Sequence, residues 1–310
     1  MIASASLPTR GTIAERIVRL KKERNAILLA HNYQVGDIQD VADFVGDSLE
    51  LAQVAGKTDA AVIVFCGVHF MAETAAVLCP RQIVLMPDLA AGCGMSEMIT
   101  AEEVRRLKNA HPDAAVVCYV NSSAAVKAES DICCTSSNAA RVVQSIPEGR
   151  EIIFIPDQFL GAHVMRETGR PLILFNGYCP THFRIMASEL AEAKLAYPNA
   201  IVLAHPECTP DVNAMADHVV STSGISREAK VADQTHLIVA TETGMLHRLA
   251  KENPDKTFIP ACSSCDCKHM KVNRLESLLW SLEDMQYEVV VEEAVRQKAK
   301  QAIEAMLALG

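Results

Sequence analysis

Three short apolar runs, each followed directly by polar residues, divide the chain into similar segments. They are AILLA at residues 26–30, AAVVC at 114–118 and AIVLA at 200–204. Two further apolar runs follow each of them, at 61–65 and 83–87, at 152–155 and 172–175, and at 237–240 and 258–260. Helical patterns separate the runs. Buried strands that alternate with helices predict an α/β fold with parallel sheets covered on both faces.

Polar residues recur at fixed distances after the first run of each segment. The reference positions are the ring residues His31, Tyr119 and His205. Two positions later stand Tyr33, Asn121 and Glu207; twelve positions later, Asp43, Asp131 and Asp217; seventeen positions later, Ser48, Ser136 and Thr222. Because these offsets need no gaps, the chain is interpreted as three copies of one unit, each with a parallel sheet covered on both faces.

We expect the three repeats at residues 1–98, 99–186 and 187–284, around a central site. Residues 285–310 should contain a C-terminal helix that packs back on the first repeat, and the N-terminus should be a short tail followed by an amphipathic helix. The repeated hydroxyls should start helices, as N-caps or nearby, and the three aspartates should have a structural role. Ligands of parallel sheets bind outside the carboxyl ends of the strands, where the ring residues, hydroxyls and cysteines are expected.

Three cysteines recur at nearly the repeat length. Cys93, Cys179 and Cys267 lie 62, 60 and 62 positions after the three ring residues. Iron–sulfur clusters are held by thiolates, and three protein thiolates on a four-iron cluster leave one iron open as a Lewis acid. The cysteines at 66, 79, 118, 133, 134 and 208 are expected to be buried small hydrophobes. Repeat spacing does not choose between Cys265, at offset 60, and Cys267 as the third ligand.

Composition and charge exclude several classes of function. The net charge is −9 without a basic run, which argues against binding to nucleic acid or an anionic membrane. The longest apolar run, at 60–68, is too short to span a bilayer, and the N-terminus lacks a secretion signal. We therefore expect a cytoplasmic protein. Eleven cysteines without an export signal indicate metal binding or catalysis rather than a disulfide scaffold.

The polar residues at the strand ends suit proton transfer on an anionic small molecule. Histidines, tyrosines and a glutamate supply acid–base groups, and hydroxyls at helix starts supply neutral donors. Glu207 is the expected base, and Tyr33 or one of the histidines, His31 or His205, is the expected proton donor. His69 and Glu242 could approach the site or could be structural. No P-loop, GxGxxG or HExxH motif is present.

Several long motifs in order resemble the quinolinate synthase A family, iron–sulfur enzymes of de novo NAD biosynthesis. They include AHNYQVGDIQDVADFVGDSLELA, CGVHFMAETA, MPDLAAGCGM, IPDQFLG, ADHVVSTSGI and TETGMLHRL. The resemblance covers nearly the whole chain, and it implies three pseudo-threefold-related three-layer αβα domains with parallel sheets around a central site. It implies condensation of iminosuccinate (iminoaspartate) with dihydroxyacetone phosphate to quinolinate, phosphate and water, with L-aspartate oxidase as the source of iminosuccinate.

The resemblance also implies roles for particular residues. It implies a [4Fe–4S] cluster on Cys93, Cys179 and Cys267, the last because Met270 follows it by three positions. It implicates Tyr33 in proton transfer. The implied dicarboxylate contacts are His31, Ser48, Tyr119, Asn121, Ser136, His205, Glu207 and Thr222. The chain departs from the common CxxCxxC pattern of the family, because its final cysteines read CSSCDC.

Two other functions stay open on the residues alone. An aconitase-like hydro-lyase could use the same open iron on a different hydroxy-acid. A zinc-stabilised or thiol redox-sensing protein could instead use the cluster of Cys262, Cys265, Cys267 and His269.

Overall fold

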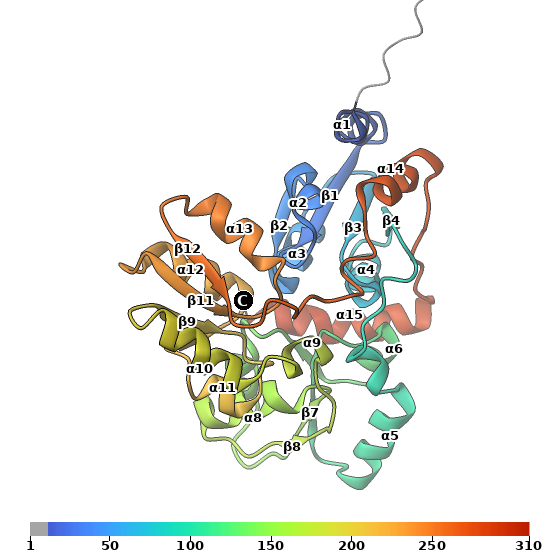
Figure 1. Ribbon diagram of the computed structural model, residues 1–310. Helices are drawn as coiled ribbons and strands as arrows, with labels where there is room; N and C mark the ends of the chain where they lie inside the picture. Colours follow the sequence, from blue (N-terminus) through green and yellow to red (C-terminus); the bar gives the residue numbers. More distant parts are fainter. Residues whose placement is uncertain (1–11, 310) are drawn as a thin grey trace, which may run out of the picture.

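The computed structural model describes residues 12–309, and the predicted N-terminal tail lies outside them. Residues 12–309 form three four-stranded sheets, and within each the strands are parallel. The predicted α/β fold of three similar units is therefore confirmed. Figure 1 shows the first unit in blue at the top, the second in green below and the third in yellow and orange at the left.

In every sheet the first strand of the repeat is paired on both sides, with the second strand on one side and the third on the other. The sheet orders are β2-β1-β3-β4, β6-β5-β7-β8 and β10-β9-β11-β12. The strands are β1 Ala26–His31, β2 Phe44–Gly46, β3 Val62–Cys66, β4 Ile83–Leu85, β5 Ala115–Tyr119, β6 Ile132–Cys134, β7 Ile152–Ile155, β8 Ile173–Leu174, β9 Ile201–Ala204, β10 His218–Val219, β11 His236–Ala240 and β12 Thr257–Pro260.

Helices connect the strands in the same order in each unit. Those of the first unit are α1 Ile13–Glu23, α2 Gly36–Val41, α3 Ser48–Ala55 and α4 His69–Leu78, followed by the 3₁₀ turn η1 Ser96–Met98. Those of the second are α5 Ala101–Ala110, α6 Ala124–Ala128, α7 Ala139–Ser145, α8 Gln158–Thr168 and α9 Pro180–Phe183. The third has α10 Ala187–Ala196, α11 Pro210–Asn213, α12 Thr222–Val231 and α13 Met245–Glu252, and α14 Leu275–Asp284 and α15 Glu293–Leu307 end the chain.

Both faces of the sheets are covered because their strands are apolar on both sides. In β1, Leu28 belongs to a core that α1 and α14 complete, whereas Leu29 belongs to the large core shared by the units. Successive side chains of a strand point to opposite faces, so a continuous apolar run fills two helix layers. This is the αβα layering that the apolar runs predict.

The three repeated aspartates hold the central strands. Each carboxylate accepts a hydrogen bond from a backbone N–H of the central strand of its own sheet, so the predicted structural role is confirmed. The pairs are Asp43 with Leu28 at 2.8 Å, Asp131 with Val116 at 2.7 Å and Asp217 with Val202 at 2.7 Å.

The C-terminal helix α15 packs differently from the expectation. It lies against α6 and β6 of the second unit and also touches α4 of the first, and it crosses the centre of Figure 1. Its buried face of Ala299, Ala302, Ile303 and Met306 belongs to the shared core. The helix therefore joins two units rather than covering the first alone. The boundaries expected at 98/99 and 186/187 stay predictions.

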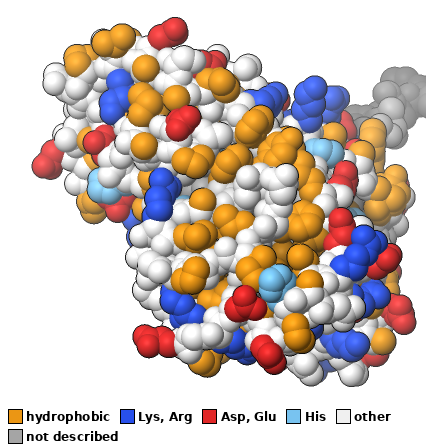
Figure 2. All heavy atoms as spheres, turned by 90° about the horizontal axis from the view of Figure 1, so that it is seen from below, with side chains coloured by type: hydrophobic (Ala, Val, Ile, Leu, Met, Phe, Trp, Pro, Cys, Tyr) orange, Lys and Arg blue, Asp and Glu red, His pale blue; other side chains and the backbone are white. Residues whose placement is uncertain are grey.

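On the face seen from below, charged side chains of one sign do not gather into a patch. In Figure 2, basic and acidic side chains are interspersed around hydrophobic ones. Among residues 12–309, no helix has the length and apolar character that a bilayer crossing requires.

Candidate active site

A cavity of about 280 Å³ opens where the carboxyl ends of the strands of the three sheets meet. Every site residue expected from the sequence lines it. They are His31, Tyr33, Ser48, Cys93, Tyr119, Asn121, Ser136, Cys179, His205, Glu207, Thr222 and Cys267. Of the two open candidates, Glu242 lines the cavity, whereas His69 is not among its lining residues and lies 3.9 Å from Glu73.

The three repeated cysteines meet in this cavity as free thiols. Cys93, Cys179 and Cys267 are half-buried and unpaired, one from each unit. Burial raises the pKa of the Cys179 thiol, and the negative charges of Glu207, Cys93 and Cys267 raise it further. Three free thiols that share one cavity fit an iron–sulfur cluster, since its ligands are thiolates.

The remaining cysteines are placed as the sequence suggests, with one clarification. The free cysteines at 66, 79, 118, 133, 134 and 208 are all buried. Cys262 and Cys265 form a disulfide, so neither offers a thiolate while it is formed. Cys267 lines the cavity and Cys265 does not. The geometry therefore favours Cys267 as the third thiol, and the four-donor zinc arrangement is absent here.

Glu207 is the buried carboxylate at the centre of the site. Its Oε1 accepts a hydrogen bond from the Tyr119 hydroxyl at 2.5 Å, and its Oε2 lies 2.7 Å from His182 Nδ1. Burial by itself would raise the pKa of this carboxyl, but the electrostatic interaction with His182 and the hydrogen bonds from His182 and Tyr119 outweigh burial and lower the pKa. Glu207 is therefore ionised and can accept a proton.

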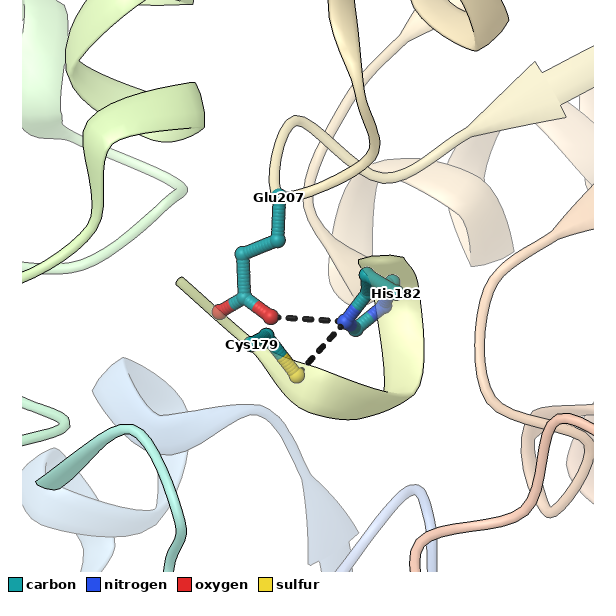
Figure 3. Close-up of side chains that lie close together, drawn as sticks. All are labelled: Cys179, His182 and Glu207. Atoms are coloured by element: carbon teal, nitrogen blue, oxygen red, sulfur yellow. Dashed lines mark hydrogen bonds and ion pairs between the residues drawn. The ribbon is translucent and has the colours of Figure 1, made fainter. Parts of the chain in front are cut away.

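His182 is a site residue that the sequence prediction missed. Its Nδ1 lies 3.2 Å from Cys179 Sγ as well as facing Glu207 (Figure 3). Its Nε2 lies 2.8 Å from Thr241 Oγ1 and 3.4 Å from the Tyr33 hydroxyl. The ring thus connects a carboxylate on one side to a tyrosine on the other. The available signal was its place in α9, one helical turn after Cys179, where residues three apart share a face.

His31 and His205 use the same ring nitrogen, Nδ1, for a hydrogen bond within the protein. The Nδ1 of each accepts a backbone N–H two residues later, from Tyr33 at 3.1 Å and Glu207 at 3.3 Å. Burial lowers the pKa of His31 to about 4 and that of His205 to about 3. Both rings are therefore neutral at pH 7 with the proton on Nε2, and they can donate to a substrate oxygen.

The two buried tyrosines stay protonated. Burial, and next the negative charge of Glu207, raise the pKa of both Tyr33 and Tyr119 well above the ordinary value. The Tyr33 hydroxyl also lies 2.7 Å from Thr241 Oγ1. Both phenols are thus hydrogen-bond donors, and Tyr33 can deliver a proton that His182 then replaces.

The repeated hydroxyls lie close to helix starts, as expected. Ser48 and Thr222 are the first residues of α3 and α12, and Ser136 lies three residues before α7. The N-cap of α3 is the preceding residue, Asp47, which the repeat did not reveal as a site residue. Hydroxyls and free N–H groups at helix starts favour anions.

Exposed cations stand at the edge of the cavity. Arg184 and Lys268 both line it, and the Arg184 guanidinium donates to the backbone carbonyl of Asp266 at 2.8 Å. Neutral donors inside and cations at the edge suit an anionic ligand, and the buried carboxylate and histidine suit proton transfer on it.

Comparison with known proteins gives full-length matches. The family model described as "NadA: Quinolinate synthetase A protein" matches residues 15–308. A protein named "Quinolinate synthase" from Dehalococcoides mccartyi (strain ATCC BAA-2100) is 56% identical over 298 residues, covering 96% of this chain and 98% of that protein. "Quinolinate synthase 2" from Methanosarcina acetivorans is 53% identical over 297 residues, covering 96% of each chain. "Quinolinate synthase" from Thermodesulfovibrio yellowstonii is 50% identical over 296 residues, covering 95% and 97%.

Proposed function

Because the chain belongs to the quinolinate synthetase A family and has quinolinate synthase activity in NAD biosynthesis, we propose that Cys93, Cys179 and Cys267 hold a [4Fe–4S] cluster in its active site. The observation that carries this proposal is the meeting of three free thiols, one from each unit, in one cavity. When bound by three thiolates, such a cluster supplies one open iron as a Lewis acid for a substrate oxygen.

The substrates follow from the activity and from the lining of the cavity. Iminosuccinate is a dicarboxylate and dihydroxyacetone phosphate is a phosphate ester, and their condensation releases phosphate and water. In this proposal the neutral Nε2–H groups of His31 and His205 donate to carboxylate oxygens, and Tyr119 contacts the dicarboxylate beside Glu207, to which its hydroxyl donates. The other proposed contacts of the dicarboxylate are Ser48, Asn121, Ser136, Glu207 and Thr222. In this proposal Arg184 and Lys268, which line the cavity, attract the phosphate ester.

Glu207, His182 and Tyr33 move the protons of the reaction. Glu207 removes a proton from the bound substrate, because it is ionised and buried against His182. Tyr33 donates a proton to a leaving or developing oxygen, and His182 restores it through the Thr241 hydroxyl. These groups are buried, so proton transfer among them is shielded from bulk water. Exclusion of water favours the dehydration steps of ring closure.

Two wider expectations belong to the same proposal. L-aspartate oxidase is the proposed source of iminosuccinate, and the cytoplasm is the proposed location. No nucleic acid or membrane partner is part of the proposal.

The experiment is purification without oxygen, followed by iron and sulfide analysis and an assay for quinolinate. We expect about four irons per chain with matching sulfide, and quinolinate only when iminosuccinate and dihydroxyacetone phosphate are both present. One zinc with no iron would refute the cluster. Dehydration of a single hydroxy-acid, without need for the triose phosphate, would favour the aconitase-like alternative.

A further inference from the structure

A partly buried ion pair, between Lys271 and Glu242, lies beside the site without taking part in the proton relay. The Lys271 ammonium lies 2.8 Å from Glu242 Oε1, and the Glu242 side chain is fully buried. The same ammonium donates to the backbone carbonyl of Tyr33 at 2.6 Å. Lys271 therefore connects the loop after β12, in the third unit, to the end of β1, in the first.

Glu242 accepts two further hydrogen bonds, one from the loop that carries Cys267 and one from its own turn after β11. Its Oε1 accepts the backbone N–H of Cys267 at 2.8 Å, and its Oε2 accepts the backbone N–H of Gly244 at 2.6 Å. A buried carboxylate is stable only when its oxygens are paired in this way. The ion pair thus holds two parts of the active site at once, the Cys267 loop and the Tyr33 backbone.

The hydroxyl of Tyr33 is held from the adjoining position. Thr241, the residue before Glu242, places its Oγ1 2.7 Å from the Tyr33 hydroxyl. Two consecutive residues after β11 therefore position Tyr33. Thr241 contacts its hydroxyl directly, and Glu242 acts on its backbone carbonyl through Lys271.

There is no room for a side chain at Gly244, which lies against Lys271 and Tyr33. A Cβ added to Gly244 would lie 2.6 Å from both Lys271 Nζ and the Tyr33 carbonyl oxygen. No side chain fits at position 244 without moving the ammonium or the tyrosine backbone, so this turn must approach both closely.

We propose that Lys271, oriented by Glu242, is a positioning residue for Tyr33. Its ammonium fixes the Tyr33 carbonyl, and thereby keeps the phenol in line with Thr241 and His182. This inference rests on the proposed role of Tyr33 as proton donor. Displacement of a catalytic group by about 1 Å can cost on the order of a hundredfold in rate, so a hydrogen bond to its backbone can matter as much as one to its side chain.

The test replaces Lys271 with methionine in the cluster-loaded enzyme. Lys271→Met should lower kcat by roughly ten- to a hundredfold with little change in KM and with unchanged iron and sulfide content. Lys251→Met is the matched control, because Lys251 forms a 2.6 Å ion pair with Asp40 between the same two units without contact to Tyr33. It should leave kcat unchanged.

The decisive measurement is the combination with Tyr33→Phe. If Lys271 acts through Tyr33, Lys271→Met should cause no further loss of kcat in the Tyr33→Phe background. A multiplied loss in the double variant, or full kcat in Lys271→Met, would overturn the proposal. Full activity of Tyr33→Phe alone would instead refute the assigned role of Tyr33, which separates the two failures.

Gly244→Ala provides a second route if Lys271→Met does not fold. It keeps the charge of Lys271 but inserts a methyl group between the ammonium and the Tyr33 carbonyl. The same loss of kcat, again absent in the Tyr33→Phe background, is expected. An unchanged kcat in Gly244→Ala would contradict the proposal.

Discussion

The Asp47 carboxylate of the first unit accepts a hydrogen bond from the Ser223 hydroxyl of the third unit, with 2.7 Å between Oδ2 and Oγ. Ser137 of the second unit donates to the same oxygen at 2.7 Å. The other oxygen, Oδ1, caps α3 by accepting the N–H groups of Leu49 and Glu50. One buried carboxylate therefore fastens together the helix starts of all three units, directly beside the hydroxyls that line the cavity.

Asp47→Ala should lower the free energy of unfolding and weaken substrate binding. Loss of the N-cap costs about 1 kcal/mol, and loss of two hydrogen bonds to a charged acceptor costs about 1.5–3 kcal/mol each. The loosened helix starts should also raise KM for iminosuccinate. Urea unfolding and steady-state kinetics measure both effects.

The control for Asp47→Ala is Ser281→Ala, which removes a buried hydroxyl that has no hydrogen-bond partner among the described residues. It should change neither KM nor, by more than a small amount, the unfolding free energy. An unchanged KM in Asp47→Ala would show that the Asp47 carboxylate does not contribute to substrate binding.

Cysteine substitutions should divide into two groups by iron content. Cys93→Ala, Cys179→Ala and Cys267→Ala should abolish cluster assembly, because each removes one of the three thiols that line the cavity. Cys133→Ala and Cys265→Ala should retain the cluster, because the first thiol is buried in a strand and the second is in a disulfide. Iron, sulfide and visible absorbance measure the outcome. Normal cluster content in Cys179→Ala would contradict the proposal that these three cysteines hold the cluster.

His182→Gln should lower kcat by roughly a hundred- to ten-thousandfold, the usual range for loss of general acid–base catalysis. Glutamine can form hydrogen bonds at this position but cannot pass a proton between Glu207 and Tyr33. Iron content should be unchanged. The control is His163→Gln on α8, whose ring pairs with Glu167.

Loss of iron in His182→Gln would show a different role for this ring. Cys179, His182 and Glu207 offer ligand atoms within 4.8 Å of one another, so a histidine that holds metal would be revealed by the metal analysis. An undiminished kcat would exclude His182 from the relay.

Lys127 should make the free energy of unfolding vary with pH in the alkaline range. Its side chain is fully buried, with the ammonium bonded to Thr74 Oγ1 at 2.9 Å and to the Phe70 carbonyl at 3.3 Å. Burial lowers the pKa of this ammonium. Between the folded pKa and the higher unfolded pKa, the unfolded chain binds more protons, so the contribution of Lys127 to stability rises with pH.

Lys127→Met should therefore stabilise the protein most at neutral pH, with an advantage that shrinks as pH rises toward 10. Methionine at this position removes the cost of burying the ammonium charge. Urea midpoints from pH 7 to 10 measure this difference. Lys108→Met, at a partly buried lysine of the same unit, is the control. A difference that does not vary with pH would contradict the expectation.

The sequence predicted the parts of the site that the three units share. Apolar runs followed by polar residues place His31, Tyr119 and His205 at strand ends, because parallel strands bring their carboxyl ends to one edge. His182 and Asp47 escaped prediction because neither has the same residue type at the equivalent positions of the other units. The packing of α15 escaped it because helical apolar spacing shows that a face is buried but not against which neighbour.

The third cysteine shows what the three-dimensional arrangement adds to the repeat spacing. Cys265 and Cys267 fit the repeat equally well, and one bond, from Cys265 to Cys262, distinguishes them. Disulfide connectivity does not follow from spacing.

Comparison of equivalent positions in the three units separates residues that the fold requires from residues that the substrate requires. Position twelve of every unit is the same residue making the same bond, whereas position two is a tyrosine, an asparagine and a glutamate. A residue that all three copies keep is required by the architecture, and a residue in which they differ is free to serve an asymmetric substrate. Exchanging the position-twelve aspartates for asparagine one at a time should thus cause three similar losses of stability, whereas exchanges at position two should cause three different defects.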